Sequence, residues 1–344
     1  MSVLNSGLLS VHRAAARPIL ARLLIKKGMF AAEAEIAIDR LFDAEVVGRH
    51  EHGLRALPAL LAAMDAGDID PRARVLTTTD FPAGALLDGG SGMGHVAVSR
   101  AVTLAVEKAR DTGVAVVAVR NSQNCGESAV YTRLAASQGL LAILTSSSGQ
   151  ANTTAVHASP AILGDHPVAI GVPTRDGRGW SCSVTAATVS SAGLARSRDV
   201  GAPLPEAAAW TVDGQQTIAA AEAELLRPAG GLCGVGLGLM SSALTCGLTG
   251  ARLPLHKRKR STFCDGSEHV CVVLDPVRFG SRERLFDEWS AAAEVWQPHL
   301  PELFPPAPAG SDEVRLHRVD LTELTLLLQS AKLDVPWAAA QTTE

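Results

Sequence analysis

The sequence predicts an α/β fold in which helices alternate with short apolar strands. The organising stretch is Asp88–Tyr131, where a glycine-rich turn precedes an amphipathic helix over Val96–Arg110, the apolar strand Val114–Val119 and a polar segment. A second observation concerns Val168–Pro173 and Trp180–Val184, two strand-like runs separated by an Asp-Gly turn. Because so short a connection suits antiparallel neighbours, we expect antiparallel pairing in this half of the chain.

The composition is that of a globular protein with a sizeable core. The chain has 344 residues, of which 47% are hydrophobic and 19% charged, enough for two or three subdomains. The formal net charge of -4 favours neither nucleic acid nor an anionic membrane as a partner. One basic run, His256–Arg260, is interpreted as a solvated loop rather than a binding patch.

Cysteine usage and the apolar runs indicate a cytoplasmic protein. The six cysteines show neither a CxxC pair nor the spacing of a zinc site, so we expect reduced thiols. No apolar run reaches the roughly 18 residues that a membrane helix needs. The N-terminus also lacks the order of basic, apolar and small-residue regions that marks a signal peptide.

Helical periodicity predicts an N-terminal helical segment over residues 1–75. The expected helices are Val11–Lys27, Ala31–Val47 and Leu54–Ala66, with the polar sequence GRHEHG before the third. A central domain is expected over 76–284, and it begins with a strand, turn and strand over Val75–Leu87. Helices of residues 285–344 are expected to pack back on the core.

The remaining elements of the chain follow from the same patterns. After the central stretch we expect helix Thr132–Gln138, strand Leu140–Leu144 and a polar loop over 146–160. Further along, we expect helix Ala192–Leu204, a surface loop Pro205–Thr217 and a glycine-rich segment that leads into a helix over 228–244. The chain is expected to continue with strand Val270–Leu274, helix Ser281–Trp296 and a last helix that is capped by Asp320 and Glu323 and ends near Leu333. For the segment 228–244 we favour close helix packing over contact of its backbone with phosphate.

The central stretch contains glycines with the spacing of a dinucleotide-binding fingerprint. Gly92-x-Gly94-x-x-Ala97 fits the GxGxxG/A pattern and opens a helix. The next strand ends at Arg120, which could meet a 2′-phosphate but not a ribose hydroxyl as an acid would. The apolar run before the glycines is thin, and such clusters occur often by chance. We therefore do not favour a Rossmann fold.

Six segments are similar in sequence and in spacing to one known family. They read GRHEHGLRALP (48–58), the run 86–126 from LLDGGSGMGH to RNSQNCG, LGDHPVAIGVP (163–173), LPEAAAWTVDGQQT (204–217), PAGGLCGVGLGLM (228–240) and HVCVVLDPVRF (269–279). The chain resembles the malate/L-lactate dehydrogenase family, which lacks a Rossmann fold and includes ureidoglycolate and sulfolactate dehydrogenases and piperideine-2-carboxylate reductase. The resemblance implies a homodimer whose predominantly antiparallel sheet holds NADH or NADPH and is flanked by helical segments.

The resemblance also implies a reaction and a catalytic residue. Family members move a hydride between the nicotinamide and C2 of a 2-hydroxy, 2-oxo or 2-imino acid. Reduction leaves negative charge on oxygen or nitrogen, so a proton donor must lie beside it, and histidine suits this role. His52, in Glu51-His52-Gly53, stands where the family has the catalytic histidine of its Ser-His-Gly motif. The alternative is a histidine that only caps or packs a helix start.

Several other family positions are substituted. The carboxylate-binding arginine is Ala56, with Arg55 adjacent, and the second histidine is Asn124. The aspartate of the D-x-A-T-S motif aligns best with Ser183, although gaps could move this by a few residues. The lysine of the GG-x-KG motif is Cys233, and the asparagine of the GTNP turn is His166. Because the framework glycines remain, we interpret the fold as retained for another substrate.

These matches lead to a set of candidate site residues. The expected catalytic residues are His52, Asn124 and Ser183, the expected substrate-binding residues are Arg55, His50 and His166, and the expected cofactor-binding residues are Asn124, Ser147, His166, Gly231 and Gly234. We expect no metal, since His50 and His52 have no evident third ligand.

Three functional hypotheses remain open. The first is an NAD(P)H-dependent reductase acting on an imine, or on a ketone that lacks the usual carboxylate. The second is a non-redox cyclase, lyase or isomerase with His52 as base, for which Cys125 and Cys233 are weighed as nucleophiles against small buried hydrophobic residues. The third is a non-catalytic dimeric protein that binds a nucleotide or metabolite.

Overall fold

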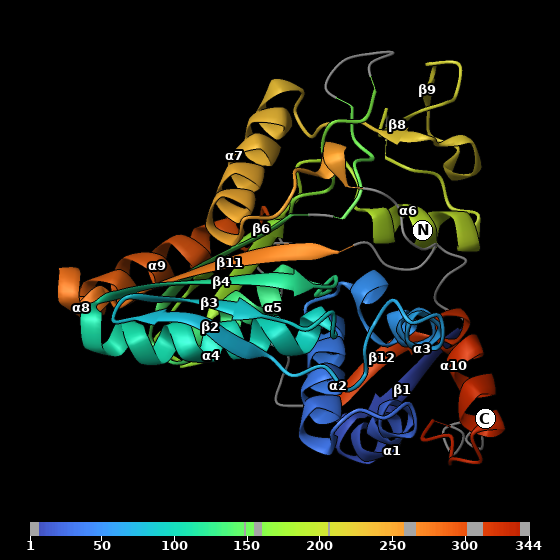
Figure 1. The fold of residues 1–344 in the computed structure, drawn as a ribbon, viewed down its shortest axis with the longest axis horizontal. Coiled ribbons are helices and arrows are strands. Elements are labelled where there is room, and N and C mark those ends of the chain that lie inside the picture. The colour runs from blue at the N-terminus through green and yellow to red at the C-terminus, as the bar shows by residue number, and fades with distance from the viewer. Residues whose placement is uncertain are drawn as a thin grey trace.

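A seven-stranded sheet forms the centre of the molecule in the computed structural model (Figure 1). The structure describes residues 7–147, 149–154, 160–205, 207–257, 266–300 and 312–337. The sheet has the order β2-β3-β4-β11-β5-β6-β7, and its strands are β2 (Leu76–Phe81), β3 (Gly84–Asp88), β4 (Val114–Ser122), β5 (Leu141–Ser147), β6 (Val168–Val172), β7 (Trp180–Val184) and β11 (Ser267–Leu274).

The strand pairing confirms the predominantly antiparallel sheet. Only β3 and β4 run parallel, joined by a helical crossover, while the other neighbours in the sheet are antiparallel. A doubly wound Rossmann sheet would be mostly parallel. The β5 strand reaches Ser147, further than the expected end at Leu144, so Ser146 and Ser147 lie on the sheet and not in a loop.

Helices cover both faces of this sheet. α4 (Gly94–Thr112) and α5 (Ser128–Ala136) lie on one face and α7 (Leu232–Thr249) on the other (Figure 1). Alanines at positions 97, 101 and 105 of α4 are buried against the strands, and their small side chains let helix and sheet approach closely. Gly113 ends the helix with φ +85, a left-handed conformation that glycine adopts without strain.

Gly92 and Gly94, at the start of α4, are packing residues. A Cβ atom on Gly94 would lie 2.0 Å from the carbonyl oxygen of Gln123 and 2.6 Å from that of Asn124. A Cβ on Gly92 would lie 2.6 Å from the Cβ of Ala73. Protein atoms therefore occupy the space that the fingerprint would reserve for a pyrophosphate.

The N-terminal part is helical, as expected, but it contains one strand. Its elements are β1 (Leu8–His12), α1 (Arg13–Lys26), α2 (Ala31–Val46), the 3-10 turns η2 (His50–His52) and η3 (Leu54–Ala56), and α3 (Leu57–Asp65). The expectation of a helix from Val11 was wrong, because Val11 pairs with Val314 of β12 (Glu313–His317). This pairing joins the two ends of the chain.

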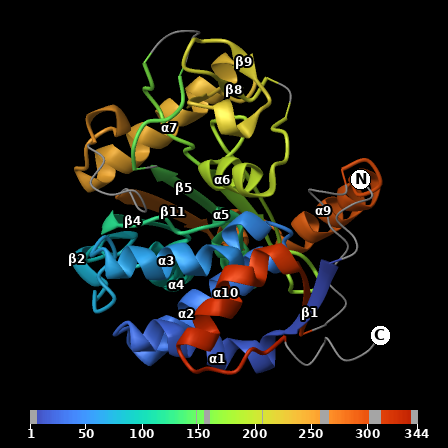
Figure 2. The same cartoon turned by 90° about the vertical axis from the view of Figure 1, so that its right-hand side faces the viewer.

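The C-terminal helices lie in two places. α8 (Pro276–Phe279) and α9 (Arg282–Trp296) lie at the far end of the sheet, where the ring of Trp289 is 5.0 Å from that of Trp180. α10 (Arg318–Ser330) packs beside α3 and η3 at the opposite end (Figure 2). Asp320 does not cap α10, whose N-cap is His317; it is buried in ion pairs with Arg55 and Arg196.

A smaller unit stands above the sheet (Figure 2). It holds α6 (Ser191–Val200), β8 (Ala209–Trp210), β9 (Gln216–Thr217), η4 (Ala220–Glu222) and β10 (Leu225–Leu226), and η5 (Pro254–His256) follows α7. The region expected as a surface loop over 205–217 thus contains the two short strands β8 and β9, which pair around a turn at Gly214.

Helix α7 buries its small and polar side and exposes its apolar side. Its buried side carries small and polar residues, among them Gly238, Ser241 and Thr245, while Leu239, Met240 and Leu244 are about half exposed or more. By length and composition alone, α7 is also long and apolar enough to cross a membrane, with mean hydropathy 1.5 over 18 residues and 33% of it buried. No run of this kind was expected from the sequence.

Candidate functional site

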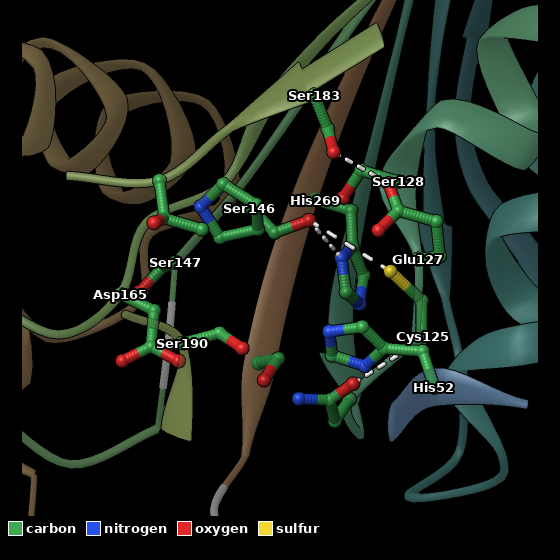
Figure 3. A pocket seen from close by; sticks show the side chains of 15 residues that line it. His52, Cys125, Glu127, Ser128, Ser146, Ser147, Asp165, Ser183, Ser190 and His269 are labelled. Atoms are coloured by element: carbon green, nitrogen blue, oxygen red, sulfur yellow. Dashed lines mark hydrogen bonds between the residues drawn. The ribbon is translucent and has the colours of Figure 1, made fainter. Parts of the chain in front are cut away.

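A pocket opens at the edge of the sheet that faces the N-terminal helical part (Figure 3). Its volume is about 490 Å³, counting the open mouth. The lining comes from η2 (His52), the β4–α5 connection (124–128), the end of β5 (Ser146 and Ser147), the loop before β6 (Asp165 and Pro167), β7 and the residues after it (Ser183, Thr185 and Ser190), and the start of β11 (Ser267 and His269). The fold thus brings together four expected residues, namely His52, Asn124, Ser147 and Ser183.

His52 offers a free imidazole to this pocket. The residue is partly exposed on η2, where its backbone N–H donates to the carbonyl of Arg49 at 2.9 Å. In the described part of the chain, its ring makes no hydrogen bond. Both ring nitrogens can therefore exchange a proton with a bound molecule.

Two other histidines near the pocket are held neutral by burial. Burial lowers the pKa of His269 to about 4 and that of His95 to about 3. The His95 ring lies behind Gly126, where a Cβ would be 2.9 Å from Nε2, and neither ring nitrogen finds a partner in the described residues. Among these three histidines, His52 is the imidazole that solvent reaches.

The Ser146 hydroxyl and the His269 ring form a hydrogen-bonded pair on the pocket floor. The His269 Nε2 is 3.1 Å from the Gln123 carbonyl, which can only accept, so this nitrogen carries the proton. Nδ1 is then the acceptor for the Ser146 hydroxyl at 2.7 Å. Sequence reasoning did not select these residues, because β5 and β11 are distant in the chain.

The two cysteines considered as nucleophiles lie in different places. Cys125 lines the pocket with its Sγ 4.0 Å from Ser146 Oγ, and burial raises the pKa of its thiol to about 12. Cys233 is exposed on α7 and does not line the pocket. A thiol at Cys125 is protonated at neutral pH and is a poor nucleophile.

Glu127 is a carboxylate in the pocket that the sequence analysis did not select. Its side chain is 6% exposed, and Oε1 accepts hydrogen bonds from Ser183 Oγ at 2.6 Å and from Ala129 N at 2.9 Å. The second of these bonds caps α5. An acid directly before a helix usually serves as a cap, so the local sequence gave no sign that it also faces a site.

Two expected substrate-binding residues are engaged elsewhere. His50 Nδ1 lies 2.5 Å from Glu45 Oε2, and this hydrogen bond raises the pKa of the imidazole. Arg55 forms ion pairs with Asp320 at 3.0 Å and with Asp199. Neither His50 nor Arg55 lines the pocket.

Two expected cofactor-binding residues are packed inside the protein. His166 is fully buried, with Nε2 3.2 Å from Ser242 Oγ, and burial lowers its pKa to about 4. A Cβ on Gly234 would lie 2.4 Å from the carbonyl oxygen of Ala186, so no ligand can approach there. Gly231, with φ +64, is exposed at the start of α7 with open space around it.

Of the two described residues of the basic run, His256 is exposed and Lys257 is a largely buried ion-pair partner. Lys257 Nζ contacts Glu268 Oε2 at 2.5 Å and Ser147 Oγ at 3.4 Å, and its side chain is only 13% exposed. The expectation of a solvated loop is therefore wrong for Lys257, while residues 258–260 lie outside the described part. The ion pair fixes Ser147 at the pocket wall.

A model of the malate/L-lactate dehydrogenase family matches residues 11–298. The chain belongs to this family. Malate dehydrogenase of Pyrococcus abyssi is 32% identical over 264 residues, which cover 73% of this chain and 70% of that protein. A pyrroline- and piperideine-2-carboxylate reductase of Pseudomonas syringae is 26% identical over 265 residues, or 75% of this chain and 77% of the reductase.

The malate/L-lactate dehydrogenase fold is also seen in solved structures. The malate dehydrogenase structure of Pyrococcus horikoshii has a TM-score of 0.83 and 22% identity, and the likeness covers 97% of this chain and 99% of the other. The family consists of NAD(P)-dependent oxidoreductases that act on small molecules. The resemblance drawn from the sequence motifs is therefore confirmed.

Membership in the family draws attention to Thr185. The family's D-x-A-T-S motif also fits Thr185-Ala186-Ala187-Thr188 without a gap, because Ala187 and Thr188 match its A-T pair. Thr185 and Ser183 both line the pocket, two residues apart on β7 and its extension. On either alignment, the resemblance places a hydroxyl residue at the position of this aspartate.

Proposed function

We propose that this protein uses NADH or NADPH to reduce a C=O or C=N group of a small 2-oxo or 2-imino acid or a related metabolite. The observation that carries the proposal is the position of His52, whose imidazole has no hydrogen-bond partner among the described residues and shares one pocket with Asn124, Ser147 and Ser183. When bound there, the reduced nicotinamide supplies a hydride. His52 then donates a proton to the oxygen or nitrogen of the reduced group.

The pocket residues fit the nicotinamide end of such a cofactor. The Asn124 Oδ1 accepts from the N–H of Gly126 at 2.7 Å, which directs its amide and leaves Nδ2 as a donor. Ser147 contributes a hydroxyl oxygen that Lys257 holds in place. We assign these two side chains to the carboxamide, and Gly231 at the open N-terminus of α7 to a more distant part of the cofactor.

Titration with each dinucleotide tests the proposal. We expect NADH or NADPH to raise the thermal stability of the purified protein, and binding at 100 times Kd adds about 2.7 kcal/mol to the free energy of unfolding. Nicotinamide absorbance should then fall on addition of a 2-oxo or 2-imino acid or a cyclic imine. A protein whose stability and fluorescence respond to neither dinucleotide would contradict the reductase.

We also propose that the protein is a homodimer in which α7 contributes to the interface. Exposed Leu239, Met240, Leu244 and Leu248 form an apolar stripe, while the polar side of the helix is already buried on the sheet. An exposed stripe of this kind is typical of a protein–protein contact. Its neighbours in a second copy would be equally apolar.

An aspartate in the centre of the stripe should dissociate the dimer. We expect Leu244→Asp to shift the molar mass measured by light scattering from two chains to one, because an unpaired carboxylate would be buried in the interface. The control is Val212→Asp, since Val212 is 83% exposed in a loop away from α7. Retention of the dimer in Leu244→Asp would exclude α7 from the interface.

A further inference from the structure

One carboxylate oxygen in the pocket has no hydrogen-bond donor. Oε1 of Glu127 already accepts from Ala129 N and Ser183 Oγ. Oε2 forms an ion pair with Nε of Arg49 at 3.7 Å, which is beyond hydrogen-bond distance, and the Arg49 side chain is 46% exposed, so solvent weakens the pair. Within the described part of the chain, Oε2 has no closer partner. A carboxylate this buried gains from a second cation that, unlike Arg49, donates a hydrogen bond to Oε2.

The other acid of the pocket differs from Glu127. Asp165 accepts from Asn152 Nδ2 at 3.0 Å and from the hydroxyl and N–H of Ser191 at 2.9 and 2.6 Å, so both of its oxygens are used to hold the loop and α6. No lysine or arginine is among the described residues that line the pocket. The anionic character of the pocket is therefore concentrated at Glu127 Oε2.

We infer that the substrate is an imine, taken as an iminium cation whose N–H donates to Glu127 Oε2. This inference rests on the proposed reduction and names its substrate class. A charge-assisted hydrogen bond of this kind is shorter and stronger than a neutral one. Ser183 and the N-terminus of α5 hold the carboxyl group in place through Oε1, so Ser183 acts as a positioning residue.

The reduction of the imine uses three groups: Glu127, His52 and the reduced dinucleotide. The iminium cation binds already protonated from water, with its N–H on Glu127 Oε2. Its carbon accepts a hydride, with two electrons, from the reduced nicotinamide, and the π pair of C=N becomes a lone pair on nitrogen. His52 donates a proton to this lone pair. The products are the ammonium ion and the oxidised dinucleotide, and His52 regains its proton from water. A ketone has no N–H to donate to Glu127, and a substrate carboxylate would be repelled by it.

Glu127→Gln isolates the charge from the local structure. Glutamine keeps an Oε1 that can accept from Ala129 and Ser183, so the cap of α5 is preserved while the charge is lost. The matched control is Glu288→Gln, an exposed position on α9. Calorimetry without any dinucleotide compares pyrrolidinium, a cationic analogue of a reduced cyclic imine, with the neutral ring alcohol cyclopentanol.

We expect wild type and Glu288→Gln to bind pyrrolidinium more tightly than cyclopentanol. In Glu127→Gln, the affinity for pyrrolidinium should fall by about ten-fold to a hundred-fold, which is the range for a hydrogen bond to a charged group. The affinity for cyclopentanol should not change. Equal affinity of wild type for the two ligands would overturn the inference, and this comparison needs no variant.

Turnover distinguishes this inference from the proposed function. With NADH or NADPH, 1-pyrroline should have a higher kcat/KM than 1-pyrroline-2-carboxylate, and Glu127→Gln should reverse this order. Faster reduction of the carboxylate by wild type would overturn the iminium assignment and leave the reductase standing. Pyrrolidinium binding that depends on Glu127, without any response to a dinucleotide, would support the cation site and overturn the reductase.

Discussion

Replacing His52 with glutamine should lower kcat by about a hundred-fold to ten-thousand-fold, the usual contribution of a general acid. Glutamine keeps a polar side chain of similar reach but cannot transfer a proton at neutral pH. The imidazole has no protein partner in the described residues, so its loss should leave the fold intact. We therefore expect the melting temperature and the dinucleotide affinity of His52→Gln to match those of wild type.

The measurement is stopped-flow or steady-state nicotinamide absorbance with saturating dinucleotide. A matched control is His50→Gln, because His50 is two residues away, pairs with Glu45 and does not line the pocket. We expect its loss to affect stability more than kcat. If His52→Gln turned over substrate as fast as wild type, the proton would come from another group, and the assignment of His52 would fail.

Replacing Gly94 with alanine should destabilise the protein by about 3 kcal/mol or more, at the upper end of the range for overpacked sites. The added Cβ would lie 2.0 Å from the Gln123 carbonyl oxygen and 2.6 Å from that of Asn124, and backbone atoms cannot rotate away as a side chain can. The loop carrying Asn124 would have to move, so dinucleotide affinity should fall as well.

Urea denaturation monitored by tryptophan fluorescence gives the change in stability. Gly236→Ala in α7 is the control, because no atom lies within 4 Å of its Cβ position. Alanine is the better helix former, so this variant should be neutral or gain up to about 1 kcal/mol. A stable Gly94→Ala with unchanged dinucleotide affinity would mean that the contact of α4 with residues 123 and 124 is not tight in solution.

Local patterns predicted most of the central sheet and its helices. The helix expected over Val96–Arg110 is the inner part of α4, and the strand expected over Val114–Val119 is the inner part of β4. Both have strong periodicity and are bounded by glycines at 94 and 113, so neighbouring residues alone define them. The Asp-Gly turn between β6 and β7 was also predicted from neighbouring residues, and Gly177 adopts the left-handed φ of +72 there.

The errors occurred where partners are distant in the sequence. Val11 continues a helical pattern locally, yet it forms a strand because Val314 supplies the backbone hydrogen bonds. Arg55 was expected to bind a substrate, but it forms ion pairs with Asp320 and Asp199, which belong to two other elements. No window of the sequence contains both members of these pairs, so periodicity could not reveal them.

By itself, the sequence determined the family and the mostly antiparallel α/β fold, and it singled out His52 as a candidate proton donor, because these depend on motifs and spacings within single segments. Only the tertiary structure decided which polar groups share the pocket. It placed Ser146 against His269 and Ser183 against Glu127, and it left one oxygen of Glu127 open. The physical reason is that hydrogen bonds and burial depend on distances between side chains, and strands far apart in the chain meet at one edge of the sheet.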